Sequence, residues 1–262
     1  MNKIFICFQL LTLFLLPFFS MAQRLNKDNL ADSALFKEEH KSWLRKSSPY
    51  LASGMLFSYG LLAANNNQLG DLNKKIREEI LEERVPFSSK LEDKLQNAPA
   101  GAVFILNAIG VKGKNNFNDR LMIYGLSYVI MKRSVTTLKN SFGRLRPDHS
   151  DRQSFPSGHT TTAFAAAEFM RQEYKGSSPV FGIAAYTAAA ATGALRMYHN
   201  KHWLSDVVAG AGLGIASTNL AYFLYPKVKK FARLKGGTAG GNLSLTPTFT
   251  DSKPGISLSY HP

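Results

Sequence analysis

The chain alternates between apolar stretches of helical length and short polar or glycine-containing connections. Six apolar stretches are long enough to form helices, and we expect them at about residues 49–64, 98–111, 119–139, 157–174, 180–196 and 201–225. Gly143 and Pro147 follow the third stretch and Pro226 follows the last, so we expect helices to end before them. The pattern therefore predicts a largely helical chain.

Two shorter segments have the character of surface helices. Residues 71–84 alternate in charge and place Leu72, Ile76 and Ile80 on one stripe, which predicts an amphipathic helix. Ser89 precedes acidic residues and resembles a helix start, so a second short helix is expected over residues 89–96.

The C-terminal tail, residues 231–262, differs from the rest of the chain. Residues 242–246 and 256–260 alternate apolar and polar side chains, and the segment between them, Asp251–Gly255, is rich in turn residues. This pattern predicts a β-hairpin.

The N-terminus reads as a leader. Lys3 precedes an apolar run over residues 4–19, and small residues follow up to Ala22. This order is typical of a secretory signal peptide, residues 1–22, with cleavage after Ala22. Retention as a membrane anchor is the alternative, because the apolar run is long for a signal core. A polar linker is expected over residues 23–48, and the catalytic domain over residues 49–230.

The composition favours anionic partners. The chain has 32 Lys and Arg against 18 Asp and Glu, a formal net charge of +14. The sequence carries no helix-turn-helix, zinc-finger or aromatic-basic RNA motif, so nucleic acid is not the expected partner. Phosphate ligands or an anionic membrane surface fit better, and a solvated basic face without a specific partner is the alternative.

The helices do not decide by themselves whether the chain spans a membrane. Several are rich in Gly, Ala, Ser and Thr, which suits close helix packing in a bilayer. Few windows, however, reach the unbroken apolar length of a membrane span. Gly210, Gly212 and Gly214 lie within the last helix with no preceding strand, so we interpret them as packing residues and not as a dinucleotide fingerprint.

Three short motifs in the second half of the chain carry the chemistry. They are Lys139-x6-Arg146-Pro147, Pro156-Ser157-Gly158-His159 and Arg196-x5-His202-x3-Asp206. Together they contain cations suited to phosphate oxygens, two imidazoles, and a carboxylate that can orient one of them.

The second and third motifs have a geometric rationale. Ser157 is a favoured helix cap, and a helix start offers free backbone N–H groups to an anion, with His159 at its rim. His202 and Asp206 are four residues apart, so on one helix they share a face and can interact. Read singly, these motifs also fit a capped helix and an ordinary surface His–Asp pair. The combination favours phosphoryl transfer.

The three motifs resemble the signature of the type 2 phosphatidic acid phosphatase and vanadium haloperoxidase superfamily, over about residues 49–226. The resemblance implies an all-α, six-helix bundle with the site at one end, and a metal-independent reaction through a phosphohistidine. In the roles that it implies, His202 attacks phosphorus, Asp206 holds the ring of His202, and His159 protonates the leaving oxygen. The phosphoryl oxygens would be held by Lys139, Arg146, Ser157, Gly158 and Arg196.

The sequence accordingly predicts a phosphoric monoester hydrolase without a cofactor or metal. The expected substrate is a lipid phosphate such as phosphatidate, phosphatidylglycerol phosphate, an isoprenyl diphosphate or a lipid A phosphate, and the expected location is the cell envelope, with the site on the periplasmic side. A soluble periplasmic acid phosphatase acting on small phosphomonoesters is the alternative. A vanadium haloperoxidase and a non-catalytic envelope protein are less favoured. The sequence carries no indication of the oligomeric state.

Overall fold

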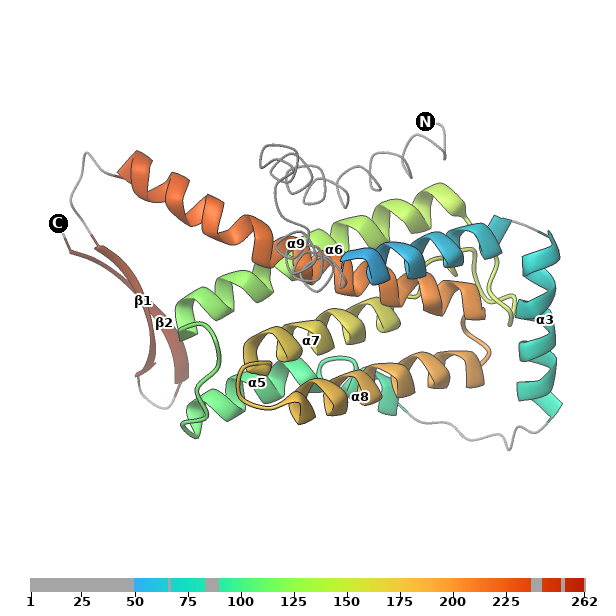
Figure 1. The fold of residues 1–262 in the computed structure, drawn as a ribbon, viewed down its shortest axis with the longest axis horizontal. Coiled ribbons are helices and arrows are strands. Elements are labelled where there is room, and N and C mark those ends of the chain that lie inside the picture. The colour runs from blue at the N-terminus through green and yellow to red at the C-terminus, as the bar shows by residue number, and fades with distance from the viewer. Residues whose placement is uncertain (1–49, 66, 83–89, 237–241, 251–252, 262) are drawn as a thin grey trace, which may run out of the picture.

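A computed structural model describes residues 50–65, 67–82, 90–236, 242–250 and 253–261 (Figure 1). The predicted signal peptide and polar linker lie outside these residues, as do Ser88 and Ser89. Helices occupy residues 50–65, Asn67–Glu82 (α3), Leu91–Leu95 (α4), Ala98–Ala108 (α5), Phe117–Phe142 (α6), Gly158–Tyr174 (α7), Pro179–Tyr198 (α8) and Leu204–Gly236 (α9). A helix occurs at each of the predicted apolar stretches, so the helical fold class is confirmed.

The longer helices run roughly along one axis, and α3 stands across one end of this bundle (Figure 1). Helix α7 lies at the centre, where α5, α6, α8 and α9 all pack against it. Most of its residues are buried. The core is formed largely by small and aromatic side chains, among them Ala163, Ala166, Ala167, Phe169, Ala185 and Ala189.

The ends of the helices follow the local chemistry of the sequence. Side chains of Asn116, Ser157 and Ser178 cap α6, α7 and α8 by accepting hydrogen bonds from backbone amides. Helix α6 ends at Gly143, which has a left-handed backbone conformation with φ of 53°. The start of α7 at Ser157 and the end of α6 before Gly143 are therefore as predicted.

The prediction that the last helix ends at Pro226 is wrong, because α9 continues to Gly236 with Pro226 inside it. Proline removes one backbone hydrogen bond and crowds the preceding turn, but its φ angle is itself helical. The residues on both sides favour a helix, so this local cost does not end it.

Two details of the short helices also differ from expectation. The cap of α4 is at Lys90, without a side-chain hydrogen bond, and not at Ser89. On α3, Leu72 is 42% exposed while its neighbour Asn73 is buried. Asn73 donates to the carbonyl of Ala63 and accepts from the amide of Ser205. Ile76 and Ile80 line a small pocket with Met197 and Trp203, so the predicted stripe faces inward except at Leu72.

Glycines in α9 allow neighbouring helices to come into backbone contact. A Cβ atom at Gly212 would lie 2.5 Å from the backbone nitrogen of Phe57, and one at Gly210 would lie 2.8 Å from the carbonyl oxygen of Ser157. The packing interpretation of these glycines is confirmed, and Gly210 fixes the distance between α9 and the start of α7.

We expect Gly210→Ala to destabilise the protein by roughly 1–3 kcal/mol, the usual cost of overpacking a core. The added methyl group would have to push α9 away from the carbonyl of Ser157. Thermal unfolding of the purified protein measures the change. Gly125→Ala is the matched control, because a Cβ there meets nothing within 4 Å; equal melting temperatures for the two variants would contradict the prediction.

Strands Asn242–Thr250 (β1) and Lys253–His261 (β2) pair antiparallel, with Asn242 opposite His261 and Thr250 opposite Lys253. They occur where the sequence predicts a hairpin and are longer than the predicted strands.

Two of the described helices are long and apolar enough to cross a membrane. In the helix Pro179–Tyr198, 28% of the 18-residue apolar stretch is buried. In Leu204–Phe231, 72% of the corresponding stretch is buried, as expected of a core helix. Large apolar side chains are also exposed on several helices: Met55, Leu62, Ile105, Ile109, Leu121, Met122, Val129, Val180 and Ile183. Such an extensive apolar exterior is uncommon on soluble monomers and is typical of interaction with a membrane or a partner.

Candidate active site

The chain segments that carry the three motifs meet at the end of the bundle where α3 stands (Figure 1). The loop over residues 143–157 joins α6 to α7 there, and α8 connects to α9 beside it. Phe155 is fully buried and packs against Phe142, with ring centroids 4.8 Å apart. The amide of Ser157 donates to the carbonyl of Asp206 at 3.0 Å. These contacts fix the start of α7 against the start of α9.

A cavity of about 430 Å³ opens between these segments. Its lining draws on every one of the three motifs: Lys139, Arg146, Gly158, His159, Arg196 and His202. The structure therefore gathers most of the predicted site residues around one space.

His202 and Asp206 are paired, but not on one helix as predicted. Helix α9 begins at Leu204, so His202 precedes it and Asp206 lies in its first turn. An Oδ2 atom of Asp206 accepts the amide of Trp203 at 2.9 Å and lies 3.7 Å from Nδ1 of His202. The carboxylate caps its own helix and faces the imidazole at the same time, which explains the spacing of four without a shared helical face.

The environment of His202 keeps its imidazole neutral. The side chain is 2% exposed, and this burial lowers its pKa to about 4, although the nearby Asp206 opposes the shift. Among the described residues Nδ1 has no hydrogen-bond partner, and the nearest acceptor is Oδ2 of Asp206 at 3.7 Å; a closer approach of the two groups would hold the proton on Nδ1 and leave Nε2 with the lone pair. A neutral imidazole oriented in this way is suited to act as a nucleophile.

Asp206 is fully buried and is held by two residues that the sequence analysis did not identify. Arg144 donates to Oδ1 at 2.6 Å, and the hydroxyl of Ser154 donates to Oδ2. Arg144 also donates to the Ser205 hydroxyl and lies over the ring of Trp203. The buried negative charge of Asp206 is thereby compensated by a guanidinium, which a buried carboxylate requires.

Three cations from the motifs line the cavity, and Lys132 lines it as well. Lys139 donates to the carbonyl of Gln153, Arg146 pairs with Asp151 at 2.8 Å, and Arg196 pairs with Glu92 at 3.2 Å. Burial lowers the pKa of Lys139 to about 8, with Arg146 contributing, so the ammonium stays mostly charged at neutral pH. The cavity thus presents positive charge to an anion from three directions.

Ser157 has a different place from the other predicted phosphate ligands. It is fully buried, and its hydroxyl shares a hydrogen bond with Thr160 at 2.8 Å. The side chain caps α7, and the backbone amide of Ser157 donates to the carbonyl of Asp206. In this structure Ser157 supports the site from behind, whereas Gly158 lines the cavity.

Helix α4 contributes two carboxylates that the sequence analysis assigned no role. Asp93 Oδ1 lies 2.7 Å from Nε2 of His159. Glu92 is buried and contacts both Arg196 and His199, at 3.2 Å and 2.8 Å. No sequence signal marks these residues, because α4 is far from the motifs along the chain and its acidic residues resemble those of any charged surface helix.

The two imidazoles predict a bell-shaped pH dependence of kcat/KM. Activity should fall as the pH decreases through about 4, because protonation removes the lone pair of His202. Burial and then Arg196 lower the pKa of His159 below its usual 6.5, so this acid should lose its proton, and activity should fall, as the pH rises through mildly acidic values. Initial rates measured across this range, corrected for ionisation of the substrate phosphate near pH 6, test the prediction. A flat profile between pH 5 and 8 would contradict it.

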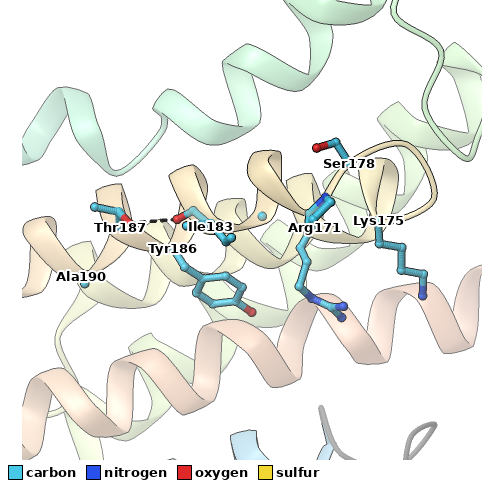
Figure 2. A pocket seen from close by; sticks show the side chains of 9 residues that line it. Arg171, Lys175, Ser178, Ile183, Tyr186, Thr187 and Ala190 are labelled. Atoms are coloured by element: carbon cyan, nitrogen blue, oxygen red, sulfur yellow. Dashed lines mark hydrogen bonds between the residues drawn. The ribbon is translucent and has the colours of Figure 1, made fainter.

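A second cavity, of about 620 Å³, lies along α8 and the end of α7 (Figure 2). Its wall is mainly apolar, with Ile183 and Ala190, and Arg171 and Lys175 lie at one end. Arg171 is bound by Glu168 through two hydrogen bonds of 2.6 Å, and Tyr186 also donates to Glu168. The lining has neither an imidazole nor a carboxylate, so we assign the chemistry to the smaller cavity.

No group of three or more His, Cys, Asp or Glu side chains among the described residues is arranged to hold a metal ion.

Comparisons with known proteins agree on one family. Residues 120–230 match the sequence model of the PAP2 superfamily. Lipid A 1-phosphatase from Porphyromonas gingivalis is 35% identical over 185 residues, which make up 70% of this chain and 39% of that protein. The chain therefore spans less than half the length of this curated relative.

Two solved structures are also similar. The transmembrane PAP2 type phosphatidylglycerolphosphate phosphatase from Bacillus subtilis superimposes with a TM-score of 0.48 at 24% identity, over 68% of this chain and 98% of that one. LpxE from Aquifex aeolicus gives a TM-score of 0.46 at 22% identity, over 58% of this chain and 95% of that one.

Proposed function

This chain belongs to the PAP2 superfamily, and from that premise we propose that it hydrolyses phosphate monoesters of lipids through a phosphohistidine intermediate. One observation carries the proposal. The three motif cations and two imidazoles, which come from separate parts of the sequence, line one cavity of about 430 Å³, and the buried carboxylate of Asp206 lies 3.7 Å from one of the imidazoles.

The reaction uses the two imidazoles in turn. Nε2 of His202 attacks phosphorus, the bond from phosphorus to the ester oxygen breaks, and His159 gives its proton to that leaving oxygen. Water then attacks phosphorus, the phosphorus–nitrogen bond breaks, and His159 takes the proton of the attacking water. The products are the alcohol and inorganic phosphate, and both histidines return to their starting states.

The cations stabilise the transition state in both steps. Negative charge spreads over the equatorial oxygens of the phosphoryl group, where fixed positive groups are most effective. Lys139, Arg146 and Arg196 line the cavity, and we assign them this role. Within the described part of the chain, Nε of Arg196 is buried without a hydrogen-bond partner. A phosphoryl oxygen would satisfy this donor.

A lipid substrate is supported by the relative and by the surface of the bundle. The Porphyromonas gingivalis protein is named for action on lipid A. The apolar exterior of α5, α6 and α8 suits a protein embedded in a membrane, where its substrate is also found. With the predicted leader, these features support a site on the outer side of the cytoplasmic membrane.

Phosphate release by the purified protein tests the function. The protein in detergent is assayed with lipid A, phosphatidylglycerol phosphate, phosphatidate and an isoprenyl diphosphate, and with small soluble phosphomonoesters. We expect the lipids to have the higher kcat/KM. Full activity on small esters, together with release from membranes by salt alone, would favour the soluble acid phosphatase instead.

A quenched reaction with a ³²P-labelled substrate tests the intermediate. A phosphohistidine survives alkali and is lost in acid, so the trapped label should show this stability and should map to the peptide that contains His202. Release of phosphate without a labelled protein under conditions of rapid turnover would count against the covalent route.

A further inference from the structure

The short helix α4 brings a second histidine–carboxylate pair to the site. Asp93 Oδ1 lies 2.7 Å from Nε2 of His159, although the two residues are 66 positions apart. The neighbouring Glu92 anchors α4, because its buried carboxylate binds Arg196 on α8 and His199 at the C-terminal cap of α8. Gln96, just after α4, lines the same cavity. Helix α4 is therefore held in place as part of the site.

The two histidine–carboxylate pairs differ in how the negative charge of the carboxylate is compensated. Asp206 is fully buried and bound by Arg144, so its charge is already neutralised before it meets His202. The side chain of Asp93 is 51% exposed, and within the described part of the chain His159 is its one ion-pair partner. Burial outweighs Asp206 and keeps His202 neutral, whereas at His159 the carboxylate of Asp93 opposes the lowering of the pKa by burial and Arg196.

The charges around His159 act in opposite directions. Burial and Arg196 on α8 lower the pKa of His159, and the hydrogen bond and charge of Asp93, together with Glu92, raise it. Lys139 on α6 and His202 before α9 line the same cavity. Among these groups, Asp93 is the one that both contacts the ring and favours its charged form.

We propose that Asp93 is the positioning residue of the general acid: its carboxylate binds Nε2–H of His159 and leaves Nδ1–H to face the leaving oxygen of the substrate. The proposal rests on the proposed function, because it assigns His159 the role of acid. As the leaving oxygen takes the proton from Nδ1, the ring becomes neutral and keeps its hydrogen bond to Asp93. Asp93 does not itself exchange a proton with the substrate.

Asp93→Asn tests this role, because asparagine keeps the shape of the side chain and removes its charge. The variant is assayed with an alkyl ester, the lipid phosphate that the wild-type protein hydrolyses best, and with p-nitrophenyl phosphate, whose leaving group departs without a proton. General acid help contributes roughly 10²–10⁴-fold, and we expect a loss of about 10–100-fold in kcat/KM on the lipid. On the nitrophenyl ester we expect a change of less than about 3-fold, since the acid is dispensable there.

The pH profile gives a second readout. The basic limb of kcat/KM for the lipid should move to lower pH in Asp93→Asn, while the acid limb, which belongs to His202, stays in place. Asp93→Glu should restore part of the activity. Lys94→Gln is the matched control on the next, exposed position of α4 and should behave as wild type.

The outcomes distinguish a failure of this proposal from a failure of the proposed phosphatase function on which it rests. Equal losses on both esters would mean that Asp93 has only a structural role, and a gain on the lipid would mean that Asp93 blocks the acid. Either result overturns the proposal and leaves the phosphatase assignment standing. Failure of the wild-type protein to hydrolyse either ester would overturn both.

Discussion

We expect His202→Ala to lower kcat by at least about 10³-fold on every substrate that the protein hydrolyses. The nucleophile takes part in both steps, and loss of such a residue removes most of the catalysis that its partners support. Phosphate release under saturating substrate measures the effect, and no labelled intermediate should be trapped. Burial of the substituted side chain makes a folding check necessary, and the variant should unfold cooperatively like the wild type.

His149→Asn is the matched control for this experiment. His149 is exposed on the loop between α6 and α7, and its φ of 60° is tolerated by asparagine. It should retain wild-type activity. Hydrolysis by His202→Ala at the wild-type rate would mean that another group attacks phosphorus, and the assignment of the nucleophile would be wrong.

Arg144→Ala should have the second largest effect, although Arg144 lies in none of the three motifs. Its removal leaves the carboxylate of Asp206 buried without its compensating cation. We expect this to lower the free energy of unfolding by about 3 kcal/mol. This value is at the lower end of the range for breaking a buried pair, because the Arg144 side chain is 19% exposed. The carboxylate should then shift or take up a proton and no longer orient His202, and a displacement of about 1 Å can cost about 10²-fold in rate. Thermal unfolding and kcat together measure the two effects.

Arg152→Ala is the control on the same loop. Arg152 is exposed and donates to the carbonyl of Gly143, so its loss should change stability by no more than about 0.5 kcal/mol and leave kcat unchanged. If Arg144→Ala were as active and as stable as Arg152→Ala, the guanidinium would not be supporting Asp206.

Local physical rules were sufficient for much of the fold. Apolar stretches of helical length, the cap at Ser157 and the glycine at 143 are local signals, because a helix and its ends depend on neighbouring residues. The same rules failed at Pro226, where the helical preference of the flanking residues outweighs the local cost of proline. On α3 they predicted the amphipathic helix but gave no indication that Asn73 is buried by hydrogen bonds to distant residues.

The types of residue in the site, and the motifs that carry them, could be predicted from the sequence. Phosphoryl transfer needs particular functional groups, and the order of these groups along the chain is part of the sequence. Only the tertiary structure decided that Ser157 lies behind the cavity, that Arg144 compensates Asp206, and that α4 brings Asp93 to His159. These contacts join residues from separate elements, and their partners depend on how the helices pack. Backbone contact at glycines such as Gly210 sets that packing, because an added methyl group there would lie 2.8 Å from the carbonyl oxygen of Ser157.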